Sequence, residues 1–160
     1  MDCAPTIPRC CTPPLHERYY WVKSDACSGI PNNAVRVGVN RCRNSVFVGR
    51  TRHECDIIPG KYVPSKNVVS IGYGGVEYTK CEYDVLCEQR FRWETINCGI
   101  IPKGAVAGGM TRCGETLYIG RVYHQGTHTV GKVHPSHHCC YITVCGRELS
   151  CNQYEILVLE

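Results

Sequence analysis

Apolar and polar residues alternate with a period of two along most of the chain, a pattern typical of half-buried β-strands. No segment carries the 3.6-residue apolar period of an amphipathic helix of useful length. Apolar and β-branched runs bounded by turn residues predict strands at residues 34–39, 45–50, 67–73, 83–86, 117–123, 141–144 and 154–159. The pattern therefore predicts an all-β fold with about five short strands in each half of the chain.

The second half of the chain repeats the first. Residues 31–86 align without a gap on residues 102–157 when they are shifted by 71 positions. The matches include turn, charged and apolar positions, such as Gly38/Gly109, Arg41/Arg112, Gly49/Gly120, Gly60/Gly131 and Tyr83/Tyr154. A fixed register over so many positions is the signature of an internal repeat. We expect two intertwined antiparallel β repeats related by a pseudo-two-fold axis, with equivalent clefts where they meet.

The repeat divides the chain into three parts. Residues 1–18 contain several Pro and Cys and form an N-terminal arm, residues 19–89 are the first repeat, and residues 90–160 are the second. One repeat of about 65–70 residues would be only marginally stable alone, so we expect the two repeats to share a core.

Glycine residues mark the expected turns. Residues 40–44 should form a hairpin-like turn, and residues 112–115 the corresponding one. Pro59-Gly60-Lys61 and Val130-Gly131-Lys132 are also expected to be tight turns, with glycine at a positive φ. The run Gly72-Tyr73-Gly74-Gly75 is interpreted as a bend or bulge rather than a phosphate-binding loop.

Charge is spread evenly along the chain, with 11 Lys/Arg and 9 Asp/Glu in residues 1–89 and 7 and 5 in residues 90–160. Basic runs that would neutralise phosphates are missing, so no nucleic-acid partner is expected. The sequence contains no stretch of 18 apolar residues, so no membrane-spanning helix is expected. The N-terminal segment does not resemble a signal peptide, and we expect a cytoplasmic protein, with vesicle association or unconventional release as alternatives.

Fourteen cysteines are an unusual number for 160 residues. In a short secreted chain they would suggest disulfides. The two repeats share only two cysteine positions, however, so a repeated bridge is limited to Cys27–Cys42 and Cys98–Cys113. We favour reduced, buried thiols that pack as small apolar side chains.

Motifs of catalytic sites are missing from the sequence: there is no GxSxG, HExxH or P-loop, and no GxGxxG after a strand. We therefore expect a protein without catalytic activity and without a cofactor. Five histidines and two cysteines between residues 124 and 140 are zinc-type ligands. The first repeat keeps only His53 of this set, so we interpret the segment as a polar, partly exposed loop and expect no metal site.

Five polar positions are the same in both repeats and are candidates for a duplicated function: Arg41/Arg112, Arg50/Arg121, His53/His124, Lys61/Lys132 and Glu77/Glu148. Structural interpretations exist for each, because an arginine could pair with the glutamate of its repeat and a lysine after a turn glycine is ordinarily solvated. As a set, a lysine ammonium with nearby acceptors suits the vicinal hydroxyls of a sugar. The side chains available to cover the apolar face of a sugar ring are Trp21, Trp93, Tyr118 and Tyr123.

The order of these motifs resembles a known family. The string W…P-x-x-A-V-x-x-G…V/I-G-R…P/V-G-K…E…Y-[DE]-[VI]-L occurs twice and covers about residues 21–160. It is similar to the DM-nine repeat family, whose tandem two-repeat members are grouped with natterin-like proteins. The resemblance implies an all-β fold of two intertwined repeats that often forms homodimers.

The same resemblance implies a function. Similar proteins are mannose-binding lectins of innate immunity that act in pattern recognition, commonly cytosolic. In those proteins the lysine of P-G-K and an acidic residue in the turn after A-I/V-x-x-G contact the sugar. These positions fall on Lys61 with Asn40 and on Lys132 with Thr111. The departure from the acidic residue predicts weaker, unequal or altered sugar binding, with the first site the stronger.

Two hypotheses about function follow. The leading one is a non-catalytic, mannose-type lectin whose partners are mannose or mannose-containing glycans in glycan or pathogen recognition. Its site residues are Asn40, Lys61, Thr111 and Lys132, with Arg50, Arg121, Glu77 and Glu148 as further candidates. The alternative is an intracellular stress-response or vesicle-trafficking factor with redox-sensitive cysteines.

Overall fold

The computed structural model describes residues 19–88, 90–96 and 99–160, so the predicted N-terminal arm lies outside the described residues. Each repeat forms seven strands. In the first repeat they are β1 (Tyr20–Asp25), β2 (Arg36–Val39), β3 (Ser45–His53), β4 (Asp56–Val63), β5 (Val68–Tyr73), β6 (Val76–Lys80) and β7 (Glu82–Cys87). In the second they are β8 (Phe91–Ile96), β9 (Ala107–Met110), β10 (Thr116–His124), β11 (Thr127–His134), β12 (Cys139–Val144), β13 (Arg147–Cys151) and β14 (Tyr154–Leu159).

The fold is all-β, as the period-two pattern predicts, but the expected five strands per repeat fall short of the seven observed. The ranges predicted from the pattern match β2, β3, β5 and β7 in the first repeat and β10, β12 and β14 in the second, so the pattern missed β1, β4, β6, β8, β9, β11 and β13. These strands contain charged residues, turn-like Pro-Gly pairs or glycines, which hide the alternation. Within the described residues the helices are two short 3-10 turns, η1 (Pro64–Lys66) and η2 (Pro135–His137), and no helix is long and apolar enough to cross a membrane.

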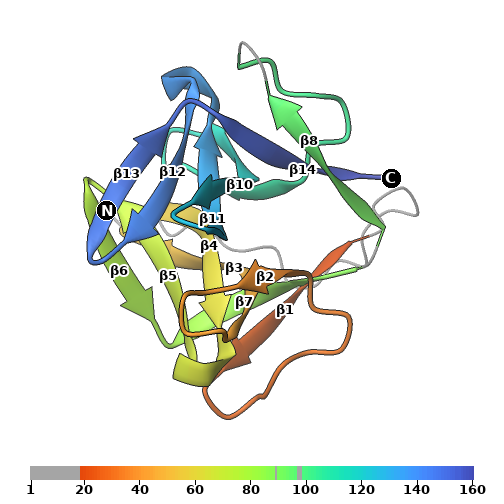
Figure 1. Cartoon of the computed structure of the whole chain (residues 1–160), viewed down its shortest axis with the longest axis vertical. Coiled ribbons are helices and arrows are strands. Elements are labelled where there is room, and N and C mark those ends of the chain that lie inside the picture. The colour runs from red at the N-terminus through yellow and green to blue at the C-terminus, as the bar shows by residue number, and fades with distance from the viewer. Residues whose placement is uncertain (1–18, 89, 97–98) are drawn as a thin grey trace.

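All strand pairs are antiparallel and join into one sheet. Its order is β1-β7-β3-β4-β5-β6-β13-β12-β11-β10-β14-β8, with β2 on β3 and β9 on β10. The order is symmetric about the junction of β6 and β13, because each strand on one side has its repeat partner at the same place on the other. Figure 1 shows the two repeats side by side, with β6 and β13 next to each other at one edge of the molecule.

Reciprocal contacts define the pseudo-two-fold axis. The Glu77 amide donates to the Gly146 carbonyl, and the Glu148 amide donates to the Gly75 carbonyl, both at 3.0 Å. The two bonds join equivalent residues, with the donor and acceptor repeats exchanged. Strand β9 of the second repeat also pairs with β4 of the first, at Ile57 and Met110. The repeats are therefore intertwined, as predicted.

The prediction of tight turns at Gly60 and Gly131 is wrong. Both glycines lie in the middle of strands, β4 and β11, and neither has a positive φ. They are needed for close approach instead: a Cβ on Gly60 would lie 2.0 Å from the Ser70 carbonyl oxygen, and one on Gly131 would lie 2.3 Å from that of Tyr141. The turns predicted at residues 40–44 and 112–115 are confirmed, whereas of the bend or bulge predicted at residues 72–75 only Gly74 and Gly75 form a turn, because Gly72 and Tyr73 lie in β5.

The central core is built from both repeats. One cluster of buried residues combines Val35, Val37, Val46, Val48 and Leu86 with Val106, Ile119, Val130 and Leu157. Two further clusters lie mostly within one repeat each. Since the central cluster is shared, the repeats stabilise one another, and the sites at their junction are held from both sides. The exact division at residues 89 and 90 stays a prediction.

Candidate functional site

Two cavities of similar size lie where the repeats meet. The first, of about 400 Å³, is lined by Asn40, Lys61 and Glu77 of the first repeat and by Thr127, Thr143 and Cys145 of the second. The second, of about 420 Å³, is lined by Thr111, Lys132 and Glu148 of the second repeat and by Asp56, Tyr73 and Gly74 of the first. Their linings correspond through the 71-residue shift, so the cavities are pseudo-equivalent. Their volumes suit a small ligand.

In the first cavity, Lys61 reaches across to the other repeat. Its ammonium donates to the Thr143 carbonyl at 2.9 Å and lies 3.4 Å from Glu77 Oε2. An ammonium group has three N–H donors, so these two contacts leave one. The sequence-based interpretation of a solvated lysine after a turn is therefore wrong, because Lys61 is paired and its side chain is 22% exposed.

In the second cavity, Lys132 makes the equivalent contacts. It donates to the Gly72 carbonyl at 2.8 Å, lies 3.1 Å from Glu148 Oε2, and sits over the Tyr141 ring at 5.3 Å. The pair is more enclosed than its counterpart, with 9% exposure for Lys132 and 6% for Glu148. The second site thus holds its lysine more rigidly.

The two glutamates line the cavities and also clamp the opposite repeat. Glu77 Oε1 accepts from the Gly146 amide, and Glu148 Oε1 accepts from the Gly75 amide, both at 3.2 Å. Burial raises the pKa of Glu77, but a hydrogen bond with Thr143 and the charge of Lys61 outweigh it and hold the pKa below its usual value. Glu77 therefore stays ionised, and each glutamate positions the lysine with which it pairs.

Asn40 and Thr111 cap the turns in which they lie. Asn40 Oδ1 accepts from the amides of Cys42 and Asn44, both at 3.0 Å, and Thr111 Oγ1 accepts from the Glu115 amide at 3.1 Å. These bonds fix the orientation of the Asn40 side chain, because its neighbours are donors. The Asn40 oxygen is therefore used locally, and its amide NH₂ is the group left for a ligand.

Arg50 and Arg121 pair differently from the sequence-based expectation. Arg50 Nε binds Asp84 at 3.0 Å, and its guanidinium stacks on Trp21 at 4.2 Å; Arg121 pairs with Glu155 and stacks on Trp93 at 4.5 Å. Neither arginine lines the two cavities. The tryptophans are likewise covered by arginine and do not offer a platform to a sugar at those cavities.

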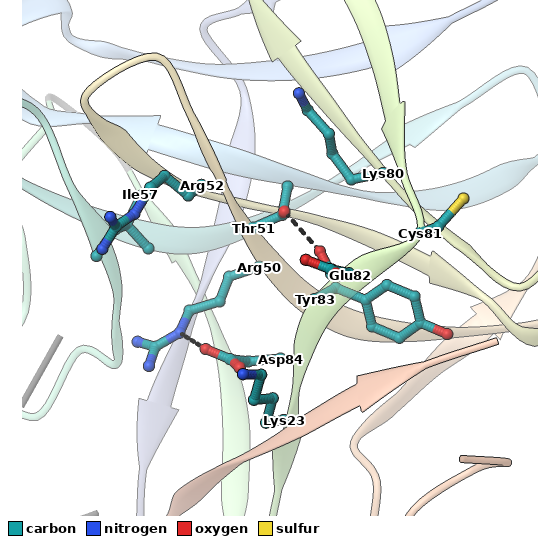
Figure 2. A pocket seen from close by; sticks show the side chains of 10 residues that line it. All are labelled: Lys23, Arg50, Thr51, Arg52, Ile57, Lys80, Cys81, Glu82, Tyr83 and Asp84. Atoms are coloured by element: carbon teal, nitrogen blue, oxygen red, sulfur yellow. Dashed lines mark hydrogen bonds and ion pairs between the residues drawn. The ribbon is translucent and has the colours of Figure 1, made fainter. Parts of the chain in front are cut away.

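Arg50 borders a third cavity of about 580 Å³, lined mainly by residues of β3 and β7. Lys23, Arg52 and Lys80 line it together with Glu82 and Asp84. Figure 2 shows the charged groups of Lys80, Arg52 and Arg50 pointing in different directions around it. Charges of both signs on neighbouring strands make this a mixed polar surface rather than a focused anion site.

Two histidine rings of the His- and Cys-rich segment lie in the second cavity. His134 and His137 stack with their centroids 3.6 Å apart, and His137 Nδ1 lies 2.8 Å from the Tyr141 hydroxyl. Burial and the charge of His137 hold the pKa of His134 below its usual value, although Glu115 opposes them. These residues lie on β11, η2 and β12, so the expectation of a loop is wrong. Among the described residues, no group of three or more His, Cys, Asp or Glu side chains is arranged to hold a metal ion.

All ten described cysteines are free thiols, including Cys27, Cys42 and Cys113; Cys98 lies outside the described residues. Burial was predicted for most of them, but six are exposed: Cys27, Cys42, Cys55, Cys81, Cys113 and Cys145. Burial raises the pKa of the Cys87 thiol to about 11 and that of Cys140 well above its usual value. The buried thiols are therefore protonated and poorly reactive.

Fold and sites together define a tandem-repeat, all-β protein with two pseudo-equivalent cavities at the junction of its repeats. The family model of the DM9 repeat matches residues 41–151, which is more than half of the chain, and the chain belongs to this family. The resemblance drawn from the sequence motifs is confirmed.

Two proteins from Thalassophryne nattereri are similar to the chain. Natterin-1 is 26% identical over 147 residues, which cover 88% of this chain and 38% of Natterin-1. Natterin-4 is 27% identical over 137 residues, which cover 80% of this chain and 31% of Natterin-4. The chain therefore spans about a third of the length of these relatives.

A solved structure shares the fold. The nematode sperm cell motility protein MFP2B matches with a TM-score of 0.68 and 12% identity, over 100% of this chain and 52% of MFP2B. At this identity the likeness concerns the fold alone.

Proposed function

We propose that this chain is a carbohydrate-binding protein, a non-catalytic lectin for mannose or mannose-containing glycans. The observation that carries the proposal is the duplicated constellation at the repeat junction. Each cavity brings a lysine ammonium, held by a glutamate and by a carbonyl of the other repeat, together with a short polar side chain from the turn after β2 or β9. Membership of the DM9 repeat family supports the same function.

The chemistry of the constellation suits a sugar. Vicinal hydroxyls act as donors and acceptors at once, so they need both kinds of partner at a fixed separation. The remaining Lys N–H and the Asn40 NH₂ are donors, the Thr111 hydroxyl is both donor and acceptor, and the carboxylates of Glu77 and Glu148 in the linings are acceptors. Single sites of this kind bind weakly, and two sites on one chain, or four in the homodimer that we also propose, raise avidity toward a glycan surface. Recognition of glycans on pathogens is the role we propose.

Calorimetric titration with methyl α-mannoside tests the proposal. The variants are Lys61→Met, Lys132→Met and their combination, because methionine keeps the length of the stem and removes the donors. Lys103→Met is the matched control, since Lys103 is exposed and lines neither cavity. Thermal unfolding of each variant separates lost binding from lost folding.

The expected result is that each single variant removes one class of site, and that the double variant, still folded, does not bind mannose while Lys103→Met binds as the parent does. Absence of binding by the parent protein would overturn the proposal. So would mannose binding by the folded double variant with parental affinity.

A further inference from the structure

We propose that the two cavities take sugars of different charge: the first binds a hexose that carries an acidic group, a carboxylate or a phosphate ester, and the second binds a neutral hexose. The inference rests on the proposed carbohydrate binding and adds the ligand class of each site.

The charge difference arises at two pairs of equivalent positions. Lys66 of the first cavity corresponds to His137 of the second, and Thr127 corresponds to Asp56. The lysine–glutamate pairs are the same in both. Over the positions that line both cavities, the first has two cations against one carboxylate, a net charge of +1. The second has one cation against two carboxylates, a net charge of −1.

The extra charges of the first cavity are not neutralised within the protein. Arg41 lines this cavity together with Lys66, and both side chains belong to exposed residues. None of the ion pairs in the described part of the chain involves either residue. The carboxylate of Glu77 in this cavity is already paired with Lys61. A ligand with a negative group would therefore meet two cations that lack a counter-charge.

Asp56 gives the second cavity the opposite sign. It crosses over from the first repeat, and its Oδ1 accepts from the Arg112 amide at 2.9 Å, a bond that leaves its negative charge in place. Its charge acts on His134, whose pKa it pushes upward against the stronger lowering effects. An acidic sugar in this cavity would lie near the carboxylates of Asp56 and Glu148.

The apolar surfaces of the cavities differ in the same sense. The second is lined by rings, His134, His137, Tyr141 and Tyr73, where the first has Val63, Lys66, Ser70 and Val144. Aromatic rings cover the C–H face of a neutral pyranose, as they cover other apolar groups. At these positions the first cavity has no ring and offers the charge of Lys66 instead; its own rings, His124 and His128, lie at other positions of the lining. The geometry thus favours two specificities on one duplicated frame.

The experiment exchanges the two differing positions between the cavities. The first variant, Lys66→His with Thr127→Asp, gives the first cavity the residues of the second. The reciprocal variant is His137→Lys with Asp56→Thr. Lys23→Glu is the matched control, because it changes the net charge by the same two units as the first variant at an exposed residue of β1 that lies outside both cavities. Calorimetry at low and high salt uses methyl α-mannoside, mannose 6-phosphate, mannuronate and inorganic phosphate.

We expect the parent protein to bind at least one acidic sugar at one site per chain more tightly than methyl α-mannoside, and less tightly as salt rises. The two acidic sugars distinguish a phosphate ester from a carboxylate. In the first variant the ratio of acidic to neutral affinity should fall about tenfold, and in the reciprocal variant a second acidic site should appear. The Lys23→Glu ratio should equal that of the parent.

Three outcomes would overturn the inference. If the parent binds methyl α-mannoside but neither acidic sugar more tightly, the inference fails and the proposed function stands. If inorganic phosphate competes as well as mannose 6-phosphate, the first cavity is an anion site and not a sugar site. If the parent binds none of the sugars, the proposed function fails together with the inference.

Discussion

Lys132 and Glu148 form the more enclosed of two equivalent ion pairs, with 3.1 Å between Nζ and Oε2 and less than a tenth of either side chain exposed. The equivalent pair, Lys61 and Glu77, has a longer separation of 3.4 Å and about twice the exposure. Each pair joins the two repeats, because the lysine and the glutamate both bind backbone groups of the opposite hairpin. The same contacts that shape the cavities therefore hold the repeats together, unequally.

Removing one partner of the enclosed pair should cost the larger amount of stability. Glu148→Ala leaves the Lys132 charge inside the sheet without a partner, which typically costs about 3–5 kcal/mol. Glu77→Ala should cost less, because water reaches Lys61 more easily. Urea unfolding of both variants measures the difference. Lys132→Met with Glu148→Leu should recover much of the loss, since no charge remains buried. Equal losses for the two glutamate variants would contradict the ranking.

The mid-strand glycines should tolerate no side chain. In Gly60→Ala the new Cβ would lie 2.0 Å from the Ser70 carbonyl oxygen, so β4 and β5 must separate. We expect a loss of about 3 kcal/mol or more, at the upper end for overpacked sites. Gly38→Ala is the control: Gly38 lies in strand β2, has no atom within 4 Å of a built Cβ and has no positive φ, so it should be neutral or slightly stabilised. Thermal unfolding of the two variants tests this, and similar midpoints would refute it.

The fold was largely predictable because two signals agree. The period of two predicts strands, and the 71-residue shift predicts two copies that meet across an axis. The structural role of Gly60 was not predictable. A glycine that adopts a positive φ and a glycine that lets a neighbouring strand approach closely look the same in the sequence. Only the position of Ser70, which depends on how β5 pairs with β4, distinguishes them.

The site was predictable only where both repeats keep a residue. Comparison of the repeats selected Lys61 and Lys132, and the structure places each in a cavity with the predicted turn residue. The contributions of Asp56 and Thr127 were missed, because each crosses into the cavity of the other repeat. The same comparison set aside His137, since the first repeat has lysine there. A comparison that keeps only shared residues therefore removes the positions at which the linings of the two cavities differ.

Acid should destabilise the protein between pH 7.5 and 5.5. Burial lowers the pKa of His53, His128 and His134 in the folded state below the usual 6.5. Protons therefore bind the unfolded chain preferentially, so the stability is present above about pH 6.5 and is lost as the pH falls. Replacing His134 by Val and His128 by Ile, the residues of the other repeat, should reduce this loss. The free energy of unfolding at the two pH values measures it, and an unchanged pH dependence in the double variant would contradict it.

Thiol labelling should separate the cysteines into two classes. The exposed thiols, such as Cys55 and Cys145, should react with iodoacetamide at pH 7.5 at least about tenfold faster than Cys87 and Cys140, whose raised pKa values leave little thiolate. Mass spectrometry of the labelled peptides gives the rate for each residue, and labelling in urea shows that every site can react. Rapid labelling of Cys140 in the folded protein would contradict the structure and would favour redox sensing at the buried thiols.

Asn40→Asp should strengthen the binding of methyl α-mannoside at the first cavity. One carboxylate oxygen would keep the cap on the amides of Cys42 and Asn44, and the other would replace the amide NH₂ with an acceptor for a sugar hydroxyl. Hydrogen bonds to an ionised acceptor are about twice as strong as neutral ones, so we expect about a fivefold gain in affinity. Asn44→Asp is the control, because it adds the same charge to the same turn at a position where the second repeat has Glu115. Calorimetry compares the two. An equal gain in both variants would show that charge alone acts, whereas a gain in Asn40→Asp alone would assign the contact to residue 40.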